Sequence, residues 1–343
     1  MSQVLLGWSA TEEELSRVRS ALPPATEVVA VEPTPGLSRY GATAEAMLAA
    51  GKDADAVLTW VLPEDFVRSA SHLRFVAWMH HGFDRLPADL LLAHQIDVAN
   101  LSRRHGVLDS AVAEQTWALL LGLAKRVVVK HNAVRAARWG AHWDASYSSA
   151  ELAGKTLAVV GFGGIGSRVA RIAAAFDMRV VAVRSDPTRD TPGVARCYGP
   201  DQLLEAVAES DYIVLATPLT PQTHRFIDAD VLSHTKPGAF IVNVGRADLV
   251  NEAAIYVALT DGDLGGFASD VWWDYVDEHP PGQHFSVPSR LGVHLLDNVI
   301  GSGDQSANTL EVKSRAIEAG LVNINAFLNG TAEEYVLDLR RGY

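Results

Sequence analysis

The chain of 343 residues contains a single cysteine, Cys197, so no disulfide can form within it. This fits a reducing compartment, and because nothing around Cys197 marks an activated thiol, we assign it no role. No stretch approaches the roughly eighteen consecutive apolar residues of a membrane-spanning helix. The N-terminus lacks a basic segment followed by a long apolar run, so we expect no signal peptide and a cytoplasmic protein.

An excess of basic residues is also missing. The formal net charge is −12, which argues against a nucleic acid or an anionic membrane as partner and favours a solvated acidic surface. The histidine pairs His80/His81 and His131/His142 lack the cysteine or carboxylate spacing of a zinc site, so we predict no metal. The length suggests two domains, and the sequence contains no internal repeat.

The first hundred residues alternate short apolar runs with polar segments. The runs at 4–8, 56–61 and 75–79 are typical of buried parallel strands with helices between them. After the first run, Ser9, Thr11 and three glutamates predict a helix N-cap and an acidic first turn. This part of the chain is therefore expected to form an α/β unit.

Residues 107–130 predict one long apolar helix, capped by Asp109 or Ser110 and ending at basic residues. The segment 131–152 that follows is too polar for a core helix and too aromatic for a solvated loop. We interpret it as an arm that contacts a second copy, with an ordinary surface connection as the alternative. From Lys155 onward, strands are expected at 156–160, 178–183, 211–217, 238–244 and 264–271, and a closing helix at 306–327.

A glycine-rich turn lies between the predicted strand 156–160 and the helix after it. It has the pattern G-x-G-x-x-G in the strand–turn–helix context that dinucleotide binding requires. The first glycine permits the tight turn, the second lets a pyrophosphate approach, and the third lets helix and strand pack closely. A turn without a ligand is the alternative. The expected cofactor contacts here are Gly161, Phe162, Gly163, Gly164, Ile165 and Gly166.

The end of the next predicted strand selects the cofactor. An acidic residue there would bind the ribose hydroxyls of NAD, but the sequence has Arg184 followed by Ser185. A guanidinium suits the 2′-phosphate of NADP, with Arg189 as a helper. We therefore predict NADP, with NAD as the alternative because Asp186 is close.

Four blocks carry a family resemblance: VVGFGGIGSRVA, SDYIVLATPLTPQTHRFI, the long block from KPGAFIVNVGR to DVWW, and LDNVIGSGDQSANT. Together they resemble the D-isomer-specific 2-hydroxyacid dehydrogenase family over most of residues 95–330. The resemblance implies an α/β fold with two Rossmann-like domains. A dinucleotide-binding domain, 103–300, would be inserted into a flavodoxin-like substrate domain made of 1–102 plus 301–343. It also implies a homodimer built through the coenzyme domain.

The resemblance assigns roles to several residues. Arg246 would bind the substrate carboxylate and polarise the carbonyl, and Asp270 would hold the nicotinamide carboxamide. His81 and Gly82 lie where backbone amides receive the substrate carboxylate. The remaining residues implied to line the cofactor are Thr217, Pro218, Val244 and Gly245.

Two catalytic positions depart from the family pattern. Tyr275 stands where the family has a supporting glutamate, which Glu278 restores only by a three-residue shift, and Asp304 replaces the proton-carrying histidine. An ionised Asp304 cannot donate a proton, but it can accept one weakly, or bind an amine or hydroxyls of a larger substrate. Capping of the following helix is the alternative role for Asp304.

Because the histidine is replaced, another residue must carry the proton. The candidates are His81, Tyr275, and His279 or His284. We favour His81, with a core histidine as the alternative, because imidazole titrates near neutral pH. The predicted function is an NAD(P)-dependent oxidoreductase acting on a small carboxylated or polyhydroxylated substrate. A lyase or hydrolase with a retained cofactor, and a silent cofactor-binding protein, remain as alternatives.

Overall fold

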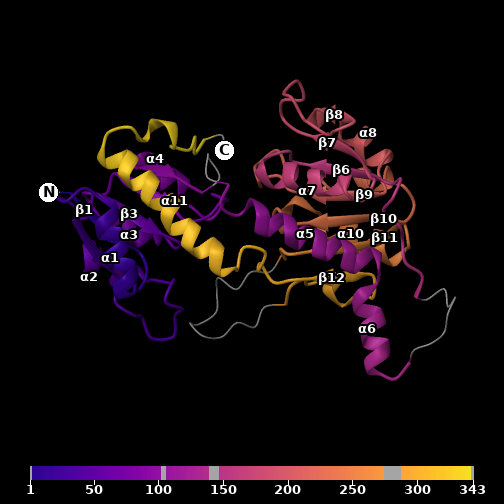
Figure 1. Cartoon of the computed structure of the whole chain (residues 1–343), viewed down its shortest axis with the longest axis horizontal. Coiled ribbons are helices and arrows are strands. Elements are labelled where there is room, and N and C mark those ends of the chain that lie inside the picture. Colours follow the sequence, from indigo (N-terminus) through magenta and orange to yellow (C-terminus); the bar gives the residue numbers. More distant parts are fainter. Residues whose placement is uncertain (1, 102–105, 139–146, 274–286, 341–343) are drawn as a thin grey trace. The chain divides into compact units, whose positions relative to one another are not determined.

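The computed structural model describes residues 2–101, 106–138, 147–273 and 287–340 (Figure 1). These residues divide into two compact units. Unit 1 contains those up to Leu108 and those from Leu310 onward, and unit 2 contains those between Asp109 and Thr309. The boundaries expected from the sequence, after residues 102 and 300, lie slightly earlier in the chain.

Unit 1 is a five-stranded parallel sheet with helices on both faces. Its strands have the order β2-β1-β3-β4-β5, the flavodoxin-like arrangement. The elements are β1 (Gln3–Leu6), α1 (Glu12–Ala21), β2 (Glu27–Ala30), α2 (Ala44–Gly51), β3 (Ala56–Thr59), α3 (Glu64–Ser69), β4 (Phe75–Trp78), α4 (Ala88–Ala93), β5 (Asp97–Ala99), α11 (Leu310–Leu328) and the 3-10 turn η5 (Ala332–Glu334).

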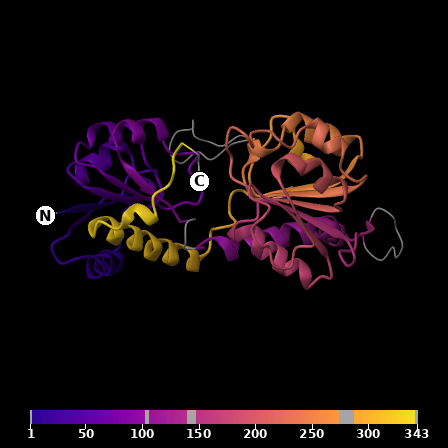
Figure 2. The ribbon, with the colours of Figure 1, turned by 90° about the horizontal axis from the view of Figure 1, so that it is seen from above.

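The first helix begins as the sequence predicts. Thr11 is the N-cap of α1 and forms a capping box with Glu14. Helices α1 and α11 lie on one face of the sheet, and α2, α3 and α4 lie on the other (Figure 2). Arg17 of α1 and Glu318 of α11 form an ion pair of 2.6 Å. The ring of Phe327 on α11 stacks on Phe75 of β4, with centroids 4.8 Å apart. The C-terminal helix is therefore part of the core of unit 1.

Unit 2 is a seven-stranded parallel sheet with the order β12-β11-β10-β9-β6-β7-β8. The order reverses at β6, which is the arrangement of a Rossmann fold. The elements are α5 (Asp109–Ala124), α6 (Val127–Arg135), β6 (Thr156–Val160), α7 (Gly164–Ala174), β7 (Arg179–Val183), β8 (Arg196–Tyr198), η2 (Pro200–Gln202), α8 (Leu203–Ala208), β9 (Tyr212–Leu215), α9 (Ala229–Ser233), β10 (Ala239–Asn243), η3 (Ala247–Leu249), α10 (Glu252–Thr260), β11 (Leu264–Ser269), η4 (Val293–Leu295) and β12 (Val299–Gly301).

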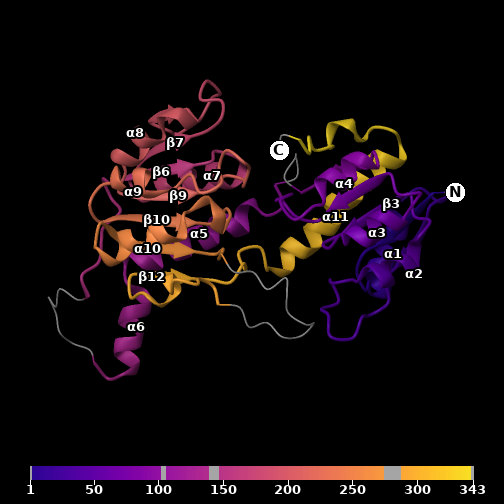
Figure 3. The same ribbon diagram turned by 180° about the vertical axis from the view of Figure 1, so that it is seen from behind.

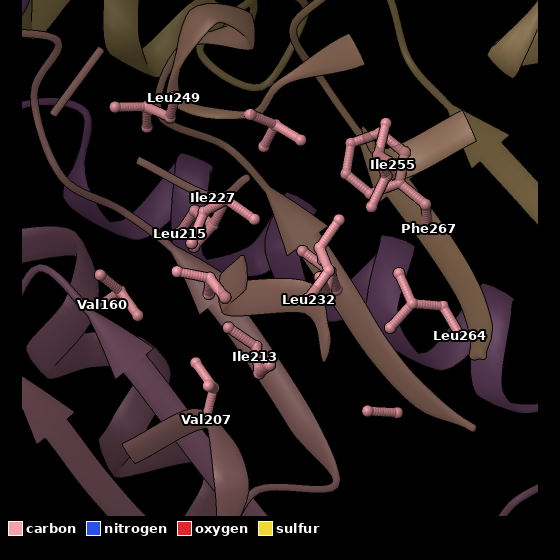
Figure 4. Packing of buried hydrophobic residues seen from close by; sticks show 14 of the residues in the cluster. Val160, Val207, Ile213, Leu215, Ile227, Leu232, Leu249, Ile255, Leu264 and Phe267 are labelled. Carbon is pink, nitrogen blue, oxygen red and sulfur yellow. The ribbon is translucent and has the colours of Figure 1, made fainter. Parts of the chain in front are cut away.

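Helices α5 and α7 cover one face of this sheet, and α8, α9 and α10 cover the other (Figure 3). Apolar side chains of the strands fill the space beneath α8–α10, among them Ile213, Leu215 and Phe267 (Figure 4). These strands are apolar on both faces because helices cover both, as expected for a parallel sheet. The two parallel sheets confirm the predicted α/β fold class.

Two helix predictions need correction. The long helix expected over 107–130 is two helices, α5 and α6, because Arg126 has a left-handed backbone with a φ of 52°. The closing helix begins at Leu310 rather than Ser306, because Ser306 is hydrogen bonded to Asp270. None of the described helices has the length and apolarity needed to cross a membrane.

Candidate cofactor and active site

The candidate site of unit 2 lies at the edge where its parallel strands end. Backbone contacts join these ends in sequence along the edge. Gly161 N donates to Val183 O at 2.9 Å, and Val244 N donates to Leu215 O at 3.1 Å. Ligands of such folds bind at the carboxyl ends of the strands, near the point where the strand order reverses. That point here is the β6–α7 turn.

The glycine-rich turn has the backbone geometry that its sequence predicts. Gly161 has a φ of 97°, and a Cβ there would lie 2.5 Å from the carbonyl oxygen of Ala216. A Cβ at Gly166 would overlap the carbonyl oxygen of Gly161, so α7 packs directly on the turn. At Gly163, the N-cap of α7, an added Cβ would meet no atom within 4 Å. The turn thus leaves room for a pyrophosphate at the helix N-terminus. Phe162 and Ile165 are half-buried beside it.

The end of β7 presents Arg184 and Ser185. Arg184 is half-buried, and its backbone N–H donates to Tyr198 O at 3.1 Å, whereas Ser185 is exposed. Asp186 turns toward its own loop, because its carboxylate accepts hydrogen bonds from Thr188 N at 3.1 Å and Thr188 Oγ1 at 2.6 Å. These hydrogen bonds, and then the charges of Arg184 and Arg189, lower the pKa of Asp186. The first side chain past the strand is therefore cationic.

The loops after β9 and β10 touch one another. A Cβ at Gly245 would lie 2.8 Å from the carbonyl oxygen of Thr217, which Pro218 follows. The buried Asn243 braces the second loop, because its side chain accepts from Gly245 N at 3.1 Å and donates to Arg246 O at 2.8 Å. Arg246 is half-buried, with Nη1 donating to Gly245 O at 2.9 Å, and Val244 before it is buried. Apart from its place in the third family block, nothing in the sequence marks Asn243 for this bracing role.

Asp270, directly after β11, is only 3% exposed and accepts four hydrogen bonds from one segment of the chain. Oδ1 accepts from Ser302 Oγ at 2.5 Å and Gln305 N at 3.1 Å. Oδ2 accepts from Ser306 N at 3.1 Å and from Ser306 Oγ. A carboxylate has about four lone-pair positions. The expected bond to a nicotinamide carboxamide would therefore have to share an oxygen that already accepts hydrogen bonds from residues 302–306. The sequence analysis did not predict these four hydrogen bonds.

Asp304 lies within this segment. Its backbone N–H donates to the carbonyl oxygen of Asp270 at 2.6 Å, and its φ is 56°, in the left-handed region. The side chain is exposed. Helix α11 begins only at Leu310, so the alternative in which Asp304 caps the following helix is wrong.

Asp109 is a further residue that the sequence analysis treated only as a helix cap. It is the first residue of α5 and 8% exposed, and its carboxylate lies against Gly164, where a Cβ would overlap it. None of the described groups donates a hydrogen bond to this carboxylate. Burial raises the pKa of Asp109, opposed by the charge of Arg168 on α7. A weakly solvated acid thus faces the N-terminus of the proposed pyrophosphate helix.

The residues expected to bind substrate in unit 1 follow β4. The carbonyl of His81 accepts from Asn100 Nδ2 at 2.6 Å, and the carbonyl of Gly82 accepts from Trp78 Nε1 at 2.8 Å. The N–H of Gly82 has no acceptor among the described residues. His81 as a residue is half-buried, and its Nε2 atom is buried. Tyr275, Glu278, His279 and His284 lie outside the described residues. Within the described part of the chain, no group of three or more His, Cys, Asp or Glu side chains could hold a metal ion.

Comparisons with known proteins agree with this geometry. Residues 117–292 match the family described as D-isomer specific 2-hydroxyacid dehydrogenase, NAD binding domain. Glyoxylate reductase from Aeropyrum pernix is 32% identical over 298 residues, covering 83% of each chain.

Solved structures share the fold. D-lactate dehydrogenase from Aquifex aeolicus, solved with NAD and lactic acid, is 25% identical with a TM-score of 0.74, covering 97% of each chain. An NADPH-dependent glyoxylate/hydroxypyruvate reductase from Sinorhizobium meliloti, solved with NADP and malonate, is 22% identical with a TM-score of 0.76, covering 99% of this chain and 98% of that one. With a glycine turn shaped for a dinucleotide and these matches over most of its length, this chain belongs to the D-isomer specific 2-hydroxyacid dehydrogenase family of NAD(P)-dependent oxidoreductases.

Proposed function

We propose that this protein uses NADP(H) to interconvert a small substrate that carries a carboxylate beside the reacting carbon. The observation that carries the proposal is the strand edge of unit 2. There the glycine turn follows β6, the cationic Arg184 follows the neighbouring β7, and Arg246 follows β10 of the same parallel sheet. The same edge offers a pyrophosphate site, a phosphate-binding cation and a carboxylate-binding guanidinium.

Arg246 is the residue assigned to the substrate carboxylate. Its guanidinium is planar and permanently charged, so it can bind a carboxylate through two parallel hydrogen bonds and polarise an adjacent carbonyl. The hydrogen bonds of Asn243 to both sides of the loop fix the backbone from which Arg246 projects. In unit 1, the N–H of Gly82 is the second group assigned to the carboxylate.

Arg184 supports NADP rather than NAD as the cofactor. A charge-assisted hydrogen bond to the 2′-phosphate is worth about 1–3 kcal/mol, or roughly 10- to 100-fold in affinity. We assign Ser185 and Arg189 as helpers at the same phosphate. Calorimetric titration of the wild type and Arg184→Ser with NADPH and NADH tests this. We expect the variant to lose affinity for NADPH only, and a wild type that binds NADH more tightly would refute the assignment.

Reduction of a carbonyl requires a proton donor, and His81 is the residue we propose. Loss of a general acid costs about 10²–10⁴-fold in rate, so His81→Gln should lower kcat by that order and flatten the pH profile near neutrality. Cofactor affinity should not change. Activity within a few-fold of the wild type would move the assignment to Tyr275.

The function itself is tested by following NADPH oxidation with glyoxylate, hydroxypyruvate and pyruvate, in the wild type and Arg246→Gln. We expect turnover of free cofactor that falls by about 10²-fold or more in the variant. Cofactor that stays bound through purification, with product at the oxidation level of the substrate, would favour the lyase or hydrolase alternative. Cofactor binding without any turnover would favour a silent binding protein.

Helix α6 supports a homodimer built through unit 2. None of its residues is buried, and Val127, Val128 and Val134 are 54%, 47% and 61% exposed. Figure 1 shows α6 extending away from the strands of its unit. Arg126 and Val128 at the start of α6 line a pocket together with Ile300. Light scattering of wild type and Val128→Glu/Val134→Glu tests the proposal. We expect a dimer that the substitutions weaken, and a monomeric wild type would contradict it.

A further inference from the structure

The position at which the family resemblance implies a proton donor carries Asp304, and contacts within unit 2 hold the backbone of that residue. The backbone N–H of Asp304 donates to Asp270 O at 2.6 Å. The next two backbone N–H groups, of Gln305 and Ser306, each donate to the Asp270 carboxylate at 3.1 Å. Ser302, two residues before Asp304, donates to the same carboxylate at 2.5 Å. The backbone on both sides of Asp304 is therefore attached to one buried acid.

A second layer of contacts holds this attachment. Ser302 Oγ also accepts from Gln115 Nε2 on α5 at 3.1 Å, and Ser302 O accepts from Trp272 Nε1 at 2.7 Å. Asp304 itself has a φ of 56°, which aspartate tolerates better than most residues. Its side chain is exposed on the strand edge that also carries Arg246 and the glycine turn. The aspartate side chain thus projects from a held backbone at this strand edge.

An exposed carboxylate makes a poor proton donor. The reference pKa of aspartic acid is about 3.9, so exposed carboxylates are ionised at neutral pH and accept hydrogen bonds. Hydride addition to a 2-oxo acid creates an alkoxide that must gain a proton in the same step or soon after. Hydride addition to a 2-iminium acid needs no added proton, because the iminium nitrogen already carries one. A carboxylate can accept that N–H and offset its charge.

We propose that the substrate of this chain is a 2-imino acid, the condensation product of a 2-oxo acid and an amine, with Asp304 binding the iminium N–H. This inference deepens the proposed function and rests on it. The hydride of the reduced nicotinamide forms a C–H bond at C2, and the electron pair of the C=N bond moves to nitrogen. The products are an N-substituted 2-amino acid and the oxidised cofactor. The amine then takes a proton from water.

The inference assigns Asp270 a positioning role. It acts through Asp304 by holding residues 302–306, and Ser306 is the side chain whose removal disturbs this network most selectively. Ser306→Ala deletes one of the four hydrogen bonds on Asp270 while leaving the carboxylate intact. Ser233→Ala is the matched control, because its hydroxyl is exposed and bonds only within and next to α9.

The test measures NADPH oxidation in two substrate mixtures, pyruvate alone and pyruvate plus methylamine. Pyruvate and methylamine form the N-methyl imine in solution. Mass spectrometry identifies the products of both mixtures. We expect N-methylalanine as the main product and a rate at least about tenfold above that with pyruvate alone. Asp304→Asn should lower the ratio of imine to carbonyl reduction by about tenfold or more, and Asp304→His should shift that ratio toward lactate.

A double-mutant cycle then tests the positioning role. Ser306→Ala should lower imine reduction by about 3- to 10-fold in the wild type and have little further effect in Asp304→Asn, because the two act as one unit. Equal effects in both backgrounds would overturn the role of the network.

The imine proposal fails if lactate is the main product at a rate that methylamine does not change, or if Asp304→Asn lowers both activities equally. Either outcome leaves the oxidoreductase proposal standing. Both proposals fail together if NADPH is not oxidised in any of the four assays, which use pyruvate, pyruvate plus methylamine, glyoxylate or hydroxypyruvate.

Discussion

At the scale of single residues, Asp109 is a group whose ionisation the fold opposes. Its carboxylate is buried against Gly164, and no described group donates a hydrogen bond to it. Burial raises its pKa, and the nearby charge of Arg168 only partly offsets this. The folded protein therefore binds this proton more tightly than the unfolded chain does. The stability that Asp109 contributes is greatest below its unfolded pKa and is lost as the pH rises toward its folded pKa.

This predicts that Asp109→Asn stabilises the protein more at high pH than at low pH. The neutral amide removes the cost of burying an ionised carboxylate, for which about 1–2 kcal/mol is a reasonable scale. Urea unfolding of the wild type and the variant at about pH 5 and about pH 8 measures the difference. Asp261→Asn, an exposed change, is the control. A variant less stable than the wild type at the higher pH would contradict the sign.

The same residue should couple cofactor binding to protons. The pyrophosphate is proposed to lie at the N-terminus of α7, against which the Asp109 carboxylate lies. The negative charge of the pyrophosphate should raise the pKa of Asp109 further. Cofactor binding is therefore expected to take up a proton and to weaken as the pH rises. Calorimetry of NADPH binding in two buffers of different ionisation enthalpy measures this uptake. We expect uptake in the wild type and less in Asp109→Asn, and equal values in the two proteins would disprove the coupling.

At the scale of elements, the β6–α7 turn separates a folding role from a binding role among its glycines. A Cβ at Gly166 would overlap the backbone of Gly161, whereas a Cβ at Gly163 would meet no atom within 4 Å. Gly166→Ala should therefore destabilise unit 2 by about 2–4 kcal/mol. Gly163→Ala should leave stability within about 1 kcal/mol and weaken NADPH binding.

Denaturant unfolding and calorimetric titration of both variants make this comparison direct. If Gly163→Ala left the affinity for NADPH unchanged, the pyrophosphate would not approach the turn at this residue. If both variants lost stability alike, the open geometry at Gly163 would be wrong.

The turn was predictable from the sequence because its signal is local. Glycine spacing, the preceding apolar strand and the following helix all lie within about twenty residues, and each has a direct conformational cause. The fold class was predictable for a related reason, since runs such as 156–160 are apolar on both faces only when helices cover both sides of a parallel sheet.

The contacts around Asp270 were not predictable in this way. Ser302 and Ser306 are ordinary polar residues in sequence, and only the pairing of β11 with β12 brings them to Asp270. The position of Asp109 against Gly164 likewise depends on how α5 packs on α7. The break at Arg126 has no sequence signal either, because arginine rarely adopts a left-handed backbone. Such features depend on tertiary contacts rather than on local propensity.

At the scale of the whole molecule, the chain consists of two units with separate sheets and cores. The cofactor residues proposed above all belong to unit 2. Hydrogen exchange should therefore show that NADPH alone protects amides of the β6–α7 turn and of the loops after β9 and β10, with a smaller effect in unit 1. NADH is the control and should protect less. Equal protection spread over both units would contradict the assignment of the dinucleotide to unit 2.

The order in which the units appear along the chain has a consequence for synthesis on the ribosome. Unit 1 begins first, but α11 completes its core only after all of unit 2 has been made, since Phe327 stacks on Phe75. The edge strand β5 also lacks one of its contacts until Leu337 has been made, because Leu337 N donates to Val98 O at 2.8 Å. All described residues of unit 2 precede α11 in the chain, so unit 2 can fold while the first 108 residues still lack their partner helix. An emerging chain should therefore reach the native state of unit 1 last.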